Sequence, residues 1–448
     1  MARSAFFEPI EKYLDEIAEL TKRGDAREES YYSSLESLLW HLADRLRKSA
    51  LTIPPIQITT LPKKTEAGNP DFRVWDGAYR VIGYIEAKLP DTDLDRIEKS
   101  DQLRRYCETF PNLLLTDFYE FRLYREGAQF MQVQIAYSTI ARKVRECPPV
   151  QNLDRFLELI ETFLSYRQPP LFTAEALAQA LARRTRFLRE EVLLPELKEK
   201  QKVLYGFYKA FQEYLVIGLK EEEFADLYAQ TLTYGLFAAR MRAQGEFSRQ
   251  QAIELIPPTI GILRDIFHYI SLGQPSPQMK SIIDDIAAVL SAANVQAILE
   301  SYKAQGRSED PIIHFYETFL AEYDPQTREQ RGVYYTPQPV VQYIVRSVHA
   351  LLRERFGYPY GIAHVVEKPG DPAPVKVLDP AAGTCTFLVE AIRLAILTHI
   401  EAFGEGLKET IVRKHILPNF YGFELLMAPY AIGHIKISLL LKDLGVPL

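Results

Sequence analysis

The run Asp-Pro-Ala-Ala-Gly-Thr-Cys-Thr-Phe-Leu at residues 379–388 constrains the fold of this chain more than any other feature. The apolar stretch from Val375 predicts a β-strand before it, and the apolar residues from about Phe387 predict a helix after it. A strand that meets a helix through small residues is typical of an open α/β sheet, where the crevice at the carboxyl end of the strand receives a nucleotide-like ligand. We expect Asp379 to open this loop and Gly383 to provide its unusual backbone dihedrals.

Two flanking segments support a ligand site. Residues 332–345 read GVYYTPQPVVQYIV, and the apolar run from Phe420 to Phe423 ends at Glu424. An acidic residue at the end of a second strand is placed to accept hydrogen bonds from ribose hydroxyls. The glycine loop alone also fits an ordinary strand-to-helix turn, so the interpretation depends on these flanking segments.

Together the three segments resemble the adenine-N6 DNA methyltransferase family of type I modification subunits and fused restriction-modification enzymes. The resemblance implies a Rossmann-like fold with S-adenosylmethionine as ligand. The positions that match the family's cofactor-binding residues are Tyr335, Thr336, Pro337, Asp379, Pro380, Ala381, Gly383 and Glu424. The first three match the segment against the methionine end of the cofactor, the next four match the loop, and the last matches the ribose acid.

Two departures limit what this segment is expected to do. Family members usually carry Gly where this chain has Cys385, so we expect this side chain to crowd the cofactor. The sequence contains no Asn-Pro-Pro-Tyr or Asp-Pro-Pro-Tyr, the tetrapeptide that holds the flipped target base in this family. Because the sequence also stops at Leu448, we expect weak cofactor binding and no DNA methylation from these residues.

Residues 69–90 predict a β-hairpin with chemical groups on one face. Stretches rich in β-formers precede and follow Asp76-Gly77, a dipeptide typical of hairpin turns. Strand alternation puts Glu86 and Lys88 on one face of the second strand. This face is therefore the candidate for catalysis.

The turn length determines what lies opposite Asp71. A two-residue turn places Asp71 opposite Ile82, and a four-residue loop places it opposite Tyr84. Both registers put it on the Glu86 face, and the longer loop brings the two carboxylates within reach of one metal ion. Carboxylates suit Mg²⁺, which assists phosphodiester hydrolysis, and Lys88 would orient the water or stabilise the developing negative charge.

The pattern Pro70-Asp71 followed by Glu86-Ala87-Lys88 resembles the PD-(D/E)xK nuclease superfamily. An acidic surface hairpin with a paired lysine is the alternative interpretation. The next helix favours a nuclease, because Gln102 and Tyr106 share one helix face and match the Gln-x-x-x-Tyr helix of one branch of the superfamily. The resemblance thus adds Gln102 to the catalytic residues.

Neighbouring segments complete a strand, strand, helix, strand order. Residues 112–125 contain two further strand-like runs. The helix before the hairpin carries Glu36, which matches the additional metal-binding acid that many of these nucleases place on their first helix. A solvent-facing position is the favoured alternative for Glu36.

Residues from Leu153 to Tyr323 predict an almost wholly helical coupler without a catalytic cluster. Its basic cluster either contacts DNA phosphates or, as we favour, forms a solvated face paired with Glu190 and Glu191. The cluster consists of Arg183, Arg184, Arg186 and Arg189.

The sequence therefore predicts a multidomain α/β protein: a nuclease at 1–150, an all-α spacer at 151–325, and the start of a methyltransferase at 326–448. This order resembles bifunctional restriction-modification enzymes of the type IIG and single-polypeptide type I classes. Type IIG fits better, because the sequence has no Walker loop for the ATP-driven translocase of the second class. The alternatives are a non-catalytic scaffold that binds DNA or partner chains, and an orphan methyltransferase with a structural nuclease fold.

Composition limits compartment and partners. Three cysteines without paired spacing argue against a disulfide framework or zinc site and favour the cytoplasm. The N-terminal segment, which charges interrupt every few residues, reads as neither a signal peptide nor a membrane span. The net charge of −6 gives no general basic surface, but a local basic groove would suffice to bind double-stranded DNA, the expected partner. The expected cofactors are Mg²⁺ and S-adenosylmethionine.

Overall fold

The computed structural model describes residues 4–48, 53–60, 70–77, 81–144, 146–167, 173–214, 216–243, 245, 247–255, 261–304, 311–324, 336–365, 372–425 and 427–446. The chain divides into two compact units. The first comprises residues 1–170, 186–207 and 275–292, and the second comprises residues 171–185, 208–274 and 293–448. Two pieces of the helical region thus belong with the N-terminal residues, and the predicted three-domain division stays a prediction.

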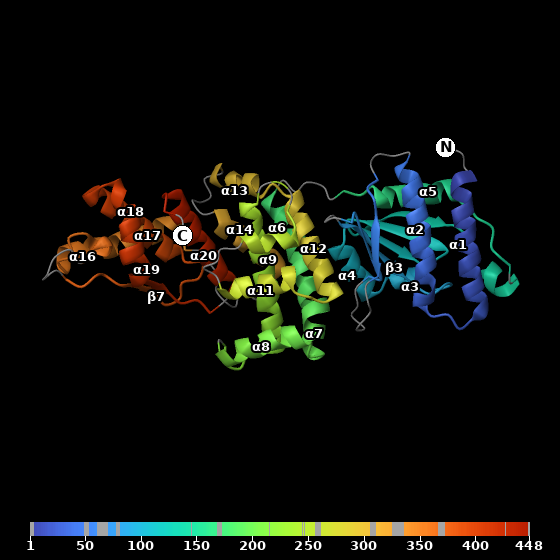
Figure 1. The fold of residues 1–448 in the computed structure, drawn as a ribbon, viewed down its shortest axis with the longest axis horizontal. Helices are drawn as coiled ribbons and strands as arrows, with labels where there is room; N and C mark the ends of the chain where they lie inside the picture. Colours follow the sequence, from blue (N-terminus) through green and yellow to red (C-terminus); the bar gives the residue numbers. More distant parts are fainter. Residues whose placement is uncertain are drawn as a thin grey trace. The chain divides into compact units, whose positions relative to one another are not determined.

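A six-stranded sheet forms the centre of the first unit (Figure 1). Its strands, which lie in sequence order, are β1 (Gln57–Thr60), β2 (Phe72–Trp75), β3 (Val81–Ala87), β4 (Asn112–Thr116), β5 (Glu120–Arg125) and β6 (Ala128–Gln134). Within this sheet, as far as it is described, β3 and β4 are the one parallel pair, and their crossover contains α3 (Leu94–Glu98) and α4 (Asp101–Thr109). The predicted strand, strand, helix, strand order is confirmed.

Helices cover both faces of this sheet. The core on one face joins β2 and β3 to α1 (Ser4–Arg23), α2 (Tyr32–Arg47) and α5 (Leu153–Leu164). The other face of β3 carries Tyr84, whose ring centroid lies 4.1 Å from that of Phe110 and whose hydroxyl lies 3.3 Å from Ser281 Oγ. Ser281 belongs to α12 (Pro277–Ala292), so a helix nearly 200 residues away in sequence covers the face that also carries Glu86.

All the described secondary-structure elements between α5 and β7 are helices, which confirms the prediction for residues 153–323. Besides α12, it contains α6 (Ala174–Phe187), η3 (Leu188–Leu193), α7 (Leu194–Lys198), α8 (Lys202–Tyr214), α9 (Glu221–Arg242), α10 (Arg249–Leu255), α11 (Gly261–Leu272), α13 (Val295–Ala304), α14 (Pro311–Tyr323), α16 (Gln338–Arg355) and η4 (Gly361–Ala363). The remaining short helices of the first unit are η1 (Glu28–Tyr31) and η2 (Ile140–Val144).

The C-terminal part of the second unit is a small α/β arrangement. Two short strands, β7 (Val377–Asp379) and β8 (Phe420–Gly422), pair in parallel, as predicted for both segments. Between them lie α17 (Thr386–Phe403), η5 (Glu405–Leu407), α18 (Lys408–Ile411), η6 (Val412–Ile416) and α19 (Leu417–Asn419), and α20 (Met427–Asp443) follows. An apolar core joins α16, α17 and α20.

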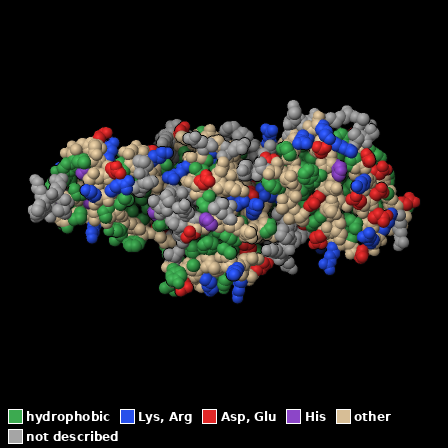
Figure 2. All heavy atoms as spheres, in the orientation of Figure 1, with side chains coloured by type: hydrophobic (Ala, Val, Ile, Leu, Met, Phe, Trp, Pro, Cys, Tyr) green, Lys and Arg blue, Asp and Glu red, His purple; other side chains and the backbone are tan. Residues whose placement is uncertain are grey.

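Charged side chains are interspersed over the face shown in Figure 2, and acidic ones are frequent along α1. Glu11, Asp15 and Glu19 are among the exposed acids of this helix. Within the described residues, no helix is both long and apolar enough to cross a membrane.

Candidate functional site

Asp71 and Glu86 lie beside each other at one end of the β2–β3 pair. Phe72 pairs with Ile85, so continuing this antiparallel ladder by one residue puts Asp71 across from Glu86. Both side chains are buried, at 0% and 1% exposure. The prediction that they share one face of the sheet is confirmed.

Both predicted registers of this hairpin are wrong. They put Asp71 opposite Ile82 or Tyr84, whereas the observed ladder puts it opposite Glu86. The connection between the strands spans residues 76–80, and a bulge at Val74/Trp75 shifts the pairing by one residue. With this longer connection, Asp71 lies directly across from Glu86, so the two carboxylates are nearer to each other than either predicted register implied.

Two hydrogen-bond donors hold the carboxylate of Asp71. The hydroxyl of Tyr32, the first residue of α2, donates to Oδ1 at 2.6 Å, and the backbone N–H of Ala87 donates to Oδ2 at 2.7 Å. Burial, and then the neighbouring Asp71, raise the pKa of Tyr32 far above its ordinary value, so the phenol remains a donor. Sequence reasoning missed Tyr32, because no local pattern connects it to a residue 39 positions away.

Lys88 brings a positive charge to this pair of carboxylates. Its Nζ atom contacts Oε1 of Glu86 as a hydrogen-bonded ion pair, and the lysine is itself largely buried. Residues two apart in an extended chain point to the same side, so this contact follows from the strand geometry. The structure thus brings Asp71, Glu86 and Lys88 together.

Helix α4 carries Gln102 and Tyr106, the next pair of predicted residues. The side-chain amide of Gln102 donates to the Tyr106 hydroxyl at 2.9 Å, which confirms that the two residues share a helix face. Burial, and then the charge of Glu86, raise the pKa of Tyr106. The phenol therefore lies within electrostatic reach of the Glu86 carboxylate.

Glu36 lies at the margin of the group. Its carboxylate accepts a hydrogen bond from Thr60 Oγ1 at 2.6 Å, and Thr60 pairs with Phe72, the residue after Asp71. Among the described residues, no group of three or more His, Cys, Asp and Glu side chains is arranged to hold a metal ion. An ion held by two carboxylates would complete its shell with water or phosphate oxygens, as Mg²⁺ commonly does.

The predicted solvated arginine face is wrong in part. Arg184 is 3% exposed, and its guanidinium donates to the Ala180 carbonyl at 3.0 Å. Glu191 forms its ion pair with Arg105 of α4 at 2.9 Å, whereas Arg189 and Glu190 do pair, at 2.5 Å. The ion pair that joins η3 to α4 was not readable from the charge pattern.

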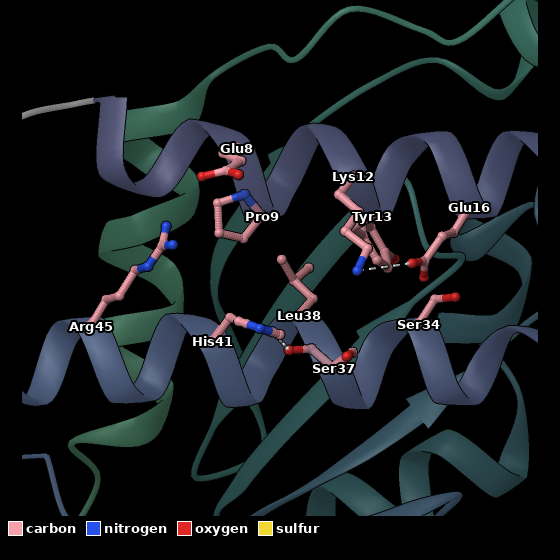
Figure 3. Close-up of a pocket in the computed structure, with 10 residues that line it drawn as sticks. All are labelled: Glu8, Pro9, Lys12, Tyr13, Glu16, Ser34, Ser37, Leu38, His41 and Arg45. Carbon is pink, nitrogen blue, oxygen red and sulfur yellow. Dashed lines mark hydrogen bonds and ion pairs between the residues drawn. The ribbon is translucent and has the colours of Figure 1, made fainter.

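A separate hollow of about 190 Å³ lies between α1 and α2 (Figure 3). Its charged lining is mixed, since Lys12 and Arg45 face the same space as Glu8 and Glu16. None of the predicted catalytic, metal or cofactor residues lines it.

The predicted cofactor loop follows β7 as expected. Its ends are tied to β8: the Phe423 N–H donates to the Asp379 carbonyl at 2.9 Å, and the Ala382 N–H donates to the Phe423 carbonyl at 2.8 Å. Gly383 adopts a positive φ of 53°, which confirms the predicted role of this glycine. Pro380 and Ala381 are exposed on the loop.

Glu424 also reaches this loop. Its Oε2 atom accepts the Gly383 N–H at 2.8 Å, so the acid predicted to bind ribose lies against the glycine of the loop. Asp379 Oδ1 accepts the Ala381 N–H at 3.2 Å. The structure thus brings Asp379, Gly383 and Glu424 together at the carboxyl ends of two parallel strands.

The upstream segment lies near α17. Thr336 and Pro337 precede α16, and Gln338 at the start of that helix donates to Glu390 Oε2 of α17 at 3.2 Å. Tyr335 lies outside the described residues.

Cys385 packs against α20. A Cβ atom on Gly433 would lie 2.5 Å from Cys385 Sγ, so the thiol occupies space that only glycine leaves open. Cys385 itself has a positive φ of 59°, and burial raises the pKa of its thiol to about 11. This direction of the side chain argues against the expected crowding of the loop. Lys436 of α20, which sequence reasoning missed, donates to Thr386 Oγ1 at 3.1 Å.

Comparisons with known proteins find similar sequences for the C-terminal part of the chain, which contains the loop after β7. Residues 307–444 match the N-6 DNA Methylase family. A 150-residue segment is 27% identical to the type I restriction enzyme EcoKI methylase subunit of Escherichia coli (strain K12) and covers 34% of this chain and 23% of that protein. The chain therefore spans about a quarter of that relative's length.

Two solved structures are also similar. A DrdV–DNA complex matches with a TM-score of 0.37 and 18% identity, covering 99% of this chain and 39% of that one. The ATP-dependent type ISP restriction-modification enzyme LlaBIII bound to DNA matches with a TM-score of 0.41 and 19% identity, covering 65% and 18%. By sequence, residues 307–444 are therefore similar to N-6 DNA methylases, and a 150-residue segment of the chain is similar to a methylase subunit of a restriction enzyme.

Proposed function

We propose that the N-terminal unit is a Mg²⁺-dependent DNA endonuclease of the PD-(D/E)xK type, joined to the N-terminal part of an adenine-N6 methyltransferase as in type IIG enzymes. The observation that supports it is the burial of Asp71 and Glu86 side by side, with Lys88 in contact with Glu86. Burying two carboxylates together is costly unless positive charge compensates them. Lys88 supplies one such charge, and a divalent cation would supply more.

The residues divide the work of phosphodiester hydrolysis. Asp71 and Glu86 would hold the ion through carboxylate oxygens. When bound, Mg²⁺ polarises the scissile phosphate and helps to generate hydroxide. Lys88 either orients the attacking water or stabilises the developing negative charge, and Gln102, held by Tyr106, assists at the same face.

A plasmid-cleavage assay tests this function. We expect the wild-type protein at high concentration to nick or cut duplex DNA in Mg²⁺ and not in EDTA. The Asp71→Ala, Glu86→Ala and Lys88→Ala variants should each lose the activity, because each removes a charged group from the same buried site. Equal cleavage by a variant with all three changes would contradict the proposal.

Glu36→Gln is the matched control for a carboxylate outside the buried pair. Glu36 accepts a hydrogen bond from Thr60, which glutamine can also accept through its amide oxygen. If Glu36 is solvent-facing, this variant keeps most of the activity. A complete loss would instead support Glu36 as a third metal-binding acid.

For the C-terminal segment we propose S-adenosylmethionine binding at the loop of Asp379, Gly383 and Glu424. The hydrogen bond from Gly383 to Glu424 supports it, because it puts the ribose acid at the mouth of the loop. The proposal concerns cofactor binding alone, because the tetrapeptide that holds the target base does not occur in these residues. If calorimetry detects binding, Glu424→Ala should weaken it by about 1 to 3 kcal/mol, and an unchanged affinity would contradict the role of Glu424.

A further inference from the structure

Tyr32 connects α2 to the carboxylate that the proposed nuclease depends on. Its hydroxyl is 2.6 Å from Asp71 Oδ1 and 3.1 Å from Glu28 Oε1. A tyrosine hydroxyl has a single hydrogen to donate. The shorter contact, to a residue with no exposed surface, indicates that this hydrogen points to Asp71.

The ring of Tyr32 is fixed independently of its hydroxyl. It is buried and packs edge-on against Phe72, with ring centroids 4.6 Å apart. Phe72 is the next residue after Asp71 and belongs to β2. The position of the donor is therefore set by the core of the sheet.

Asp71 is held from two directions. The Ala87 N–H on β3 fixes Oδ2 at 2.7 Å, while Tyr32 on α2 fixes Oδ1. With both oxygens engaged on one side, the remaining lone pairs of the carboxylate have a defined direction. Removing a group that orients a metal ligand in this way typically lowers metal affinity about 10- to 100-fold.

We infer that Tyr32 is a positioning residue of the nuclease site, which orients Asp71 for a divalent cation through its O–H···Oδ1 hydrogen bond. This inference rests on the proposed function. It assigns no contact between Tyr32 and DNA or the ion. Its effect reaches the reaction only through Asp71.

Tyr32→Phe tests the inference, because phenylalanine keeps the ring packing on Phe72 and removes only the hydroxyl. We expect Mn²⁺ affinity, measured by the free-ion signal in electron paramagnetic resonance without DNA, to fall about 10- to 100-fold. The Mg²⁺ concentration for half-maximal cleavage should rise by a similar factor. Saturating Mg²⁺ should restore part of the rate, which a purely structural defect would not allow.

Tyr13→Phe is the matched control. The Tyr13 hydroxyl is also buried and donates to the Phe118 carbonyl at 2.8 Å, but α1 carries it at the hollow of Figure 3, and its bond does not involve Asp71. This variant should lose comparable stability while Mn²⁺ affinity stays at the wild-type value. Equal Mn²⁺ affinity in wild-type and Tyr32→Phe proteins, or an equal loss in both tyrosine variants, would overturn the inference.

Asp71→Asn separates this inference from the proposed function. If Asp71→Asn abolishes Mn²⁺ binding and cleavage but Tyr32→Phe changes neither, the nuclease proposal stands and the role of Tyr32 is wrong. If Asp71→Asn leaves both unchanged, the nuclease proposal itself is contradicted, and the inference fails with it.

Discussion

The two candidate sites differ in how completely the protein buries and orients their polar groups. Asp71 and Glu86 are buried on a six-stranded sheet that helices cover on both faces. The loop after β7 is partly exposed on a two-stranded sheet, whose ladder partners Leu378 and Tyr421 are 57% and 45% exposed. The carboxylates of the proposed nuclease site are already oriented by the fold. The exposed loop, in contrast, can exchange its own hydrogen bonds for contacts with a ligand.

Hydrogen bonding shows the same contrast. Asp71 is held by Tyr32 and by the Ala87 N–H, from two different elements. Glu424 instead accepts the Gly383 N–H of the loop that it would share with a ligand. Substitutions at the first site should therefore change catalysis, while substitutions at the second should change stability and binding.

Lys88→Gln should give the largest effect, on the cleavage rate, and it tests the proposed nuclease site. Removing the charge beside Glu86 should lower the cleavage rate about 10²- to 10³-fold, by the usual cost of losing one group that stabilises transition-state charge. Lys99→Gln, at an exposed position after α3, is the matched control and should cleave like wild type. Similar cleavage rates for the Lys88 and Lys99 variants would contradict a catalytic role for Lys88 and for the buried site to which it belongs.

Asp117→Asn should show a smaller, pH-dependent effect on the first unit. Burial raises the pKa of Asp117 to about 6, and its Oδ1 accepts the N–H groups of Tyr119 and Glu120, which an asparagine oxygen can also accept. A pKa raised by folding favours the native state below pH 4, and this contribution is lost as pH rises through about 6. The stability of Asp117→Asn relative to wild type should therefore increase by about 2.5 kcal/mol between pH 4 and pH 7.

Tryptophan fluorescence measures this difference in the relevant unit, because both tryptophans, Trp40 and Trp75, belong to it. Denaturant titrations at a series of pH values give the two free energies of unfolding. A difference between the proteins that does not vary with pH would contradict the raised pKa of Asp117.

Gly433→Ala should have the smallest effect, on the stability of the second unit, and it tests the packing of the loop after β7. Its new Cβ would lie 2.5 Å from Cys385 Sγ, so we expect a loss of about 1 to 3 kcal/mol in the second unit. Cys385→Gly in the same protein should recover most of this loss, because it removes the thiol and its positive φ of 59° suits glycine.

Gly406→Ala is the matched control for this substitution, since a Cβ there meets nothing within 4 Å. Circular dichroism should detect the destabilised helices while the tryptophan transition stays unchanged. A Gly433→Ala protein as stable as the Gly406 control would contradict the packing of Cys385 on α20.

Local patterns in the sequence predicted the parts of the sites that neighbouring residues determine. Helical spacing paired Gln102 with Tyr106, and strand alternation put Glu86 and Lys88 on one face. The predicted hairpin register was wrong because the connection at residues 76–80 is longer than the Asp-Gly signal indicates and because the bulge at Val74/Trp75 has no clear sequence signal. The loop geometry at Gly383 was predicted because few residues other than glycine adopt a positive φ.

Contacts between distant elements were not predictable in this way. Tyr32 reaches Asp71 only once α2 packs on the sheet, and α12 reaches Tyr84 from the helical region. The packing of Cys385 on Gly433 likewise depends on how α20 docks. Each of these contacts is set by tertiary packing, which spacing along the chain does not encode.

The most direct test of the account is a crystal structure of the protein soaked in Mn²⁺, with data collected at the manganese absorption edge. The account predicts an anomalous peak between the carboxylates of Asp71 and Glu86, and its loss in Asp71→Asn crystals soaked in the same way. A soaked wild-type crystal with both carboxylates ordered and no peak between them would contradict the cation site, and with it the proposed nuclease.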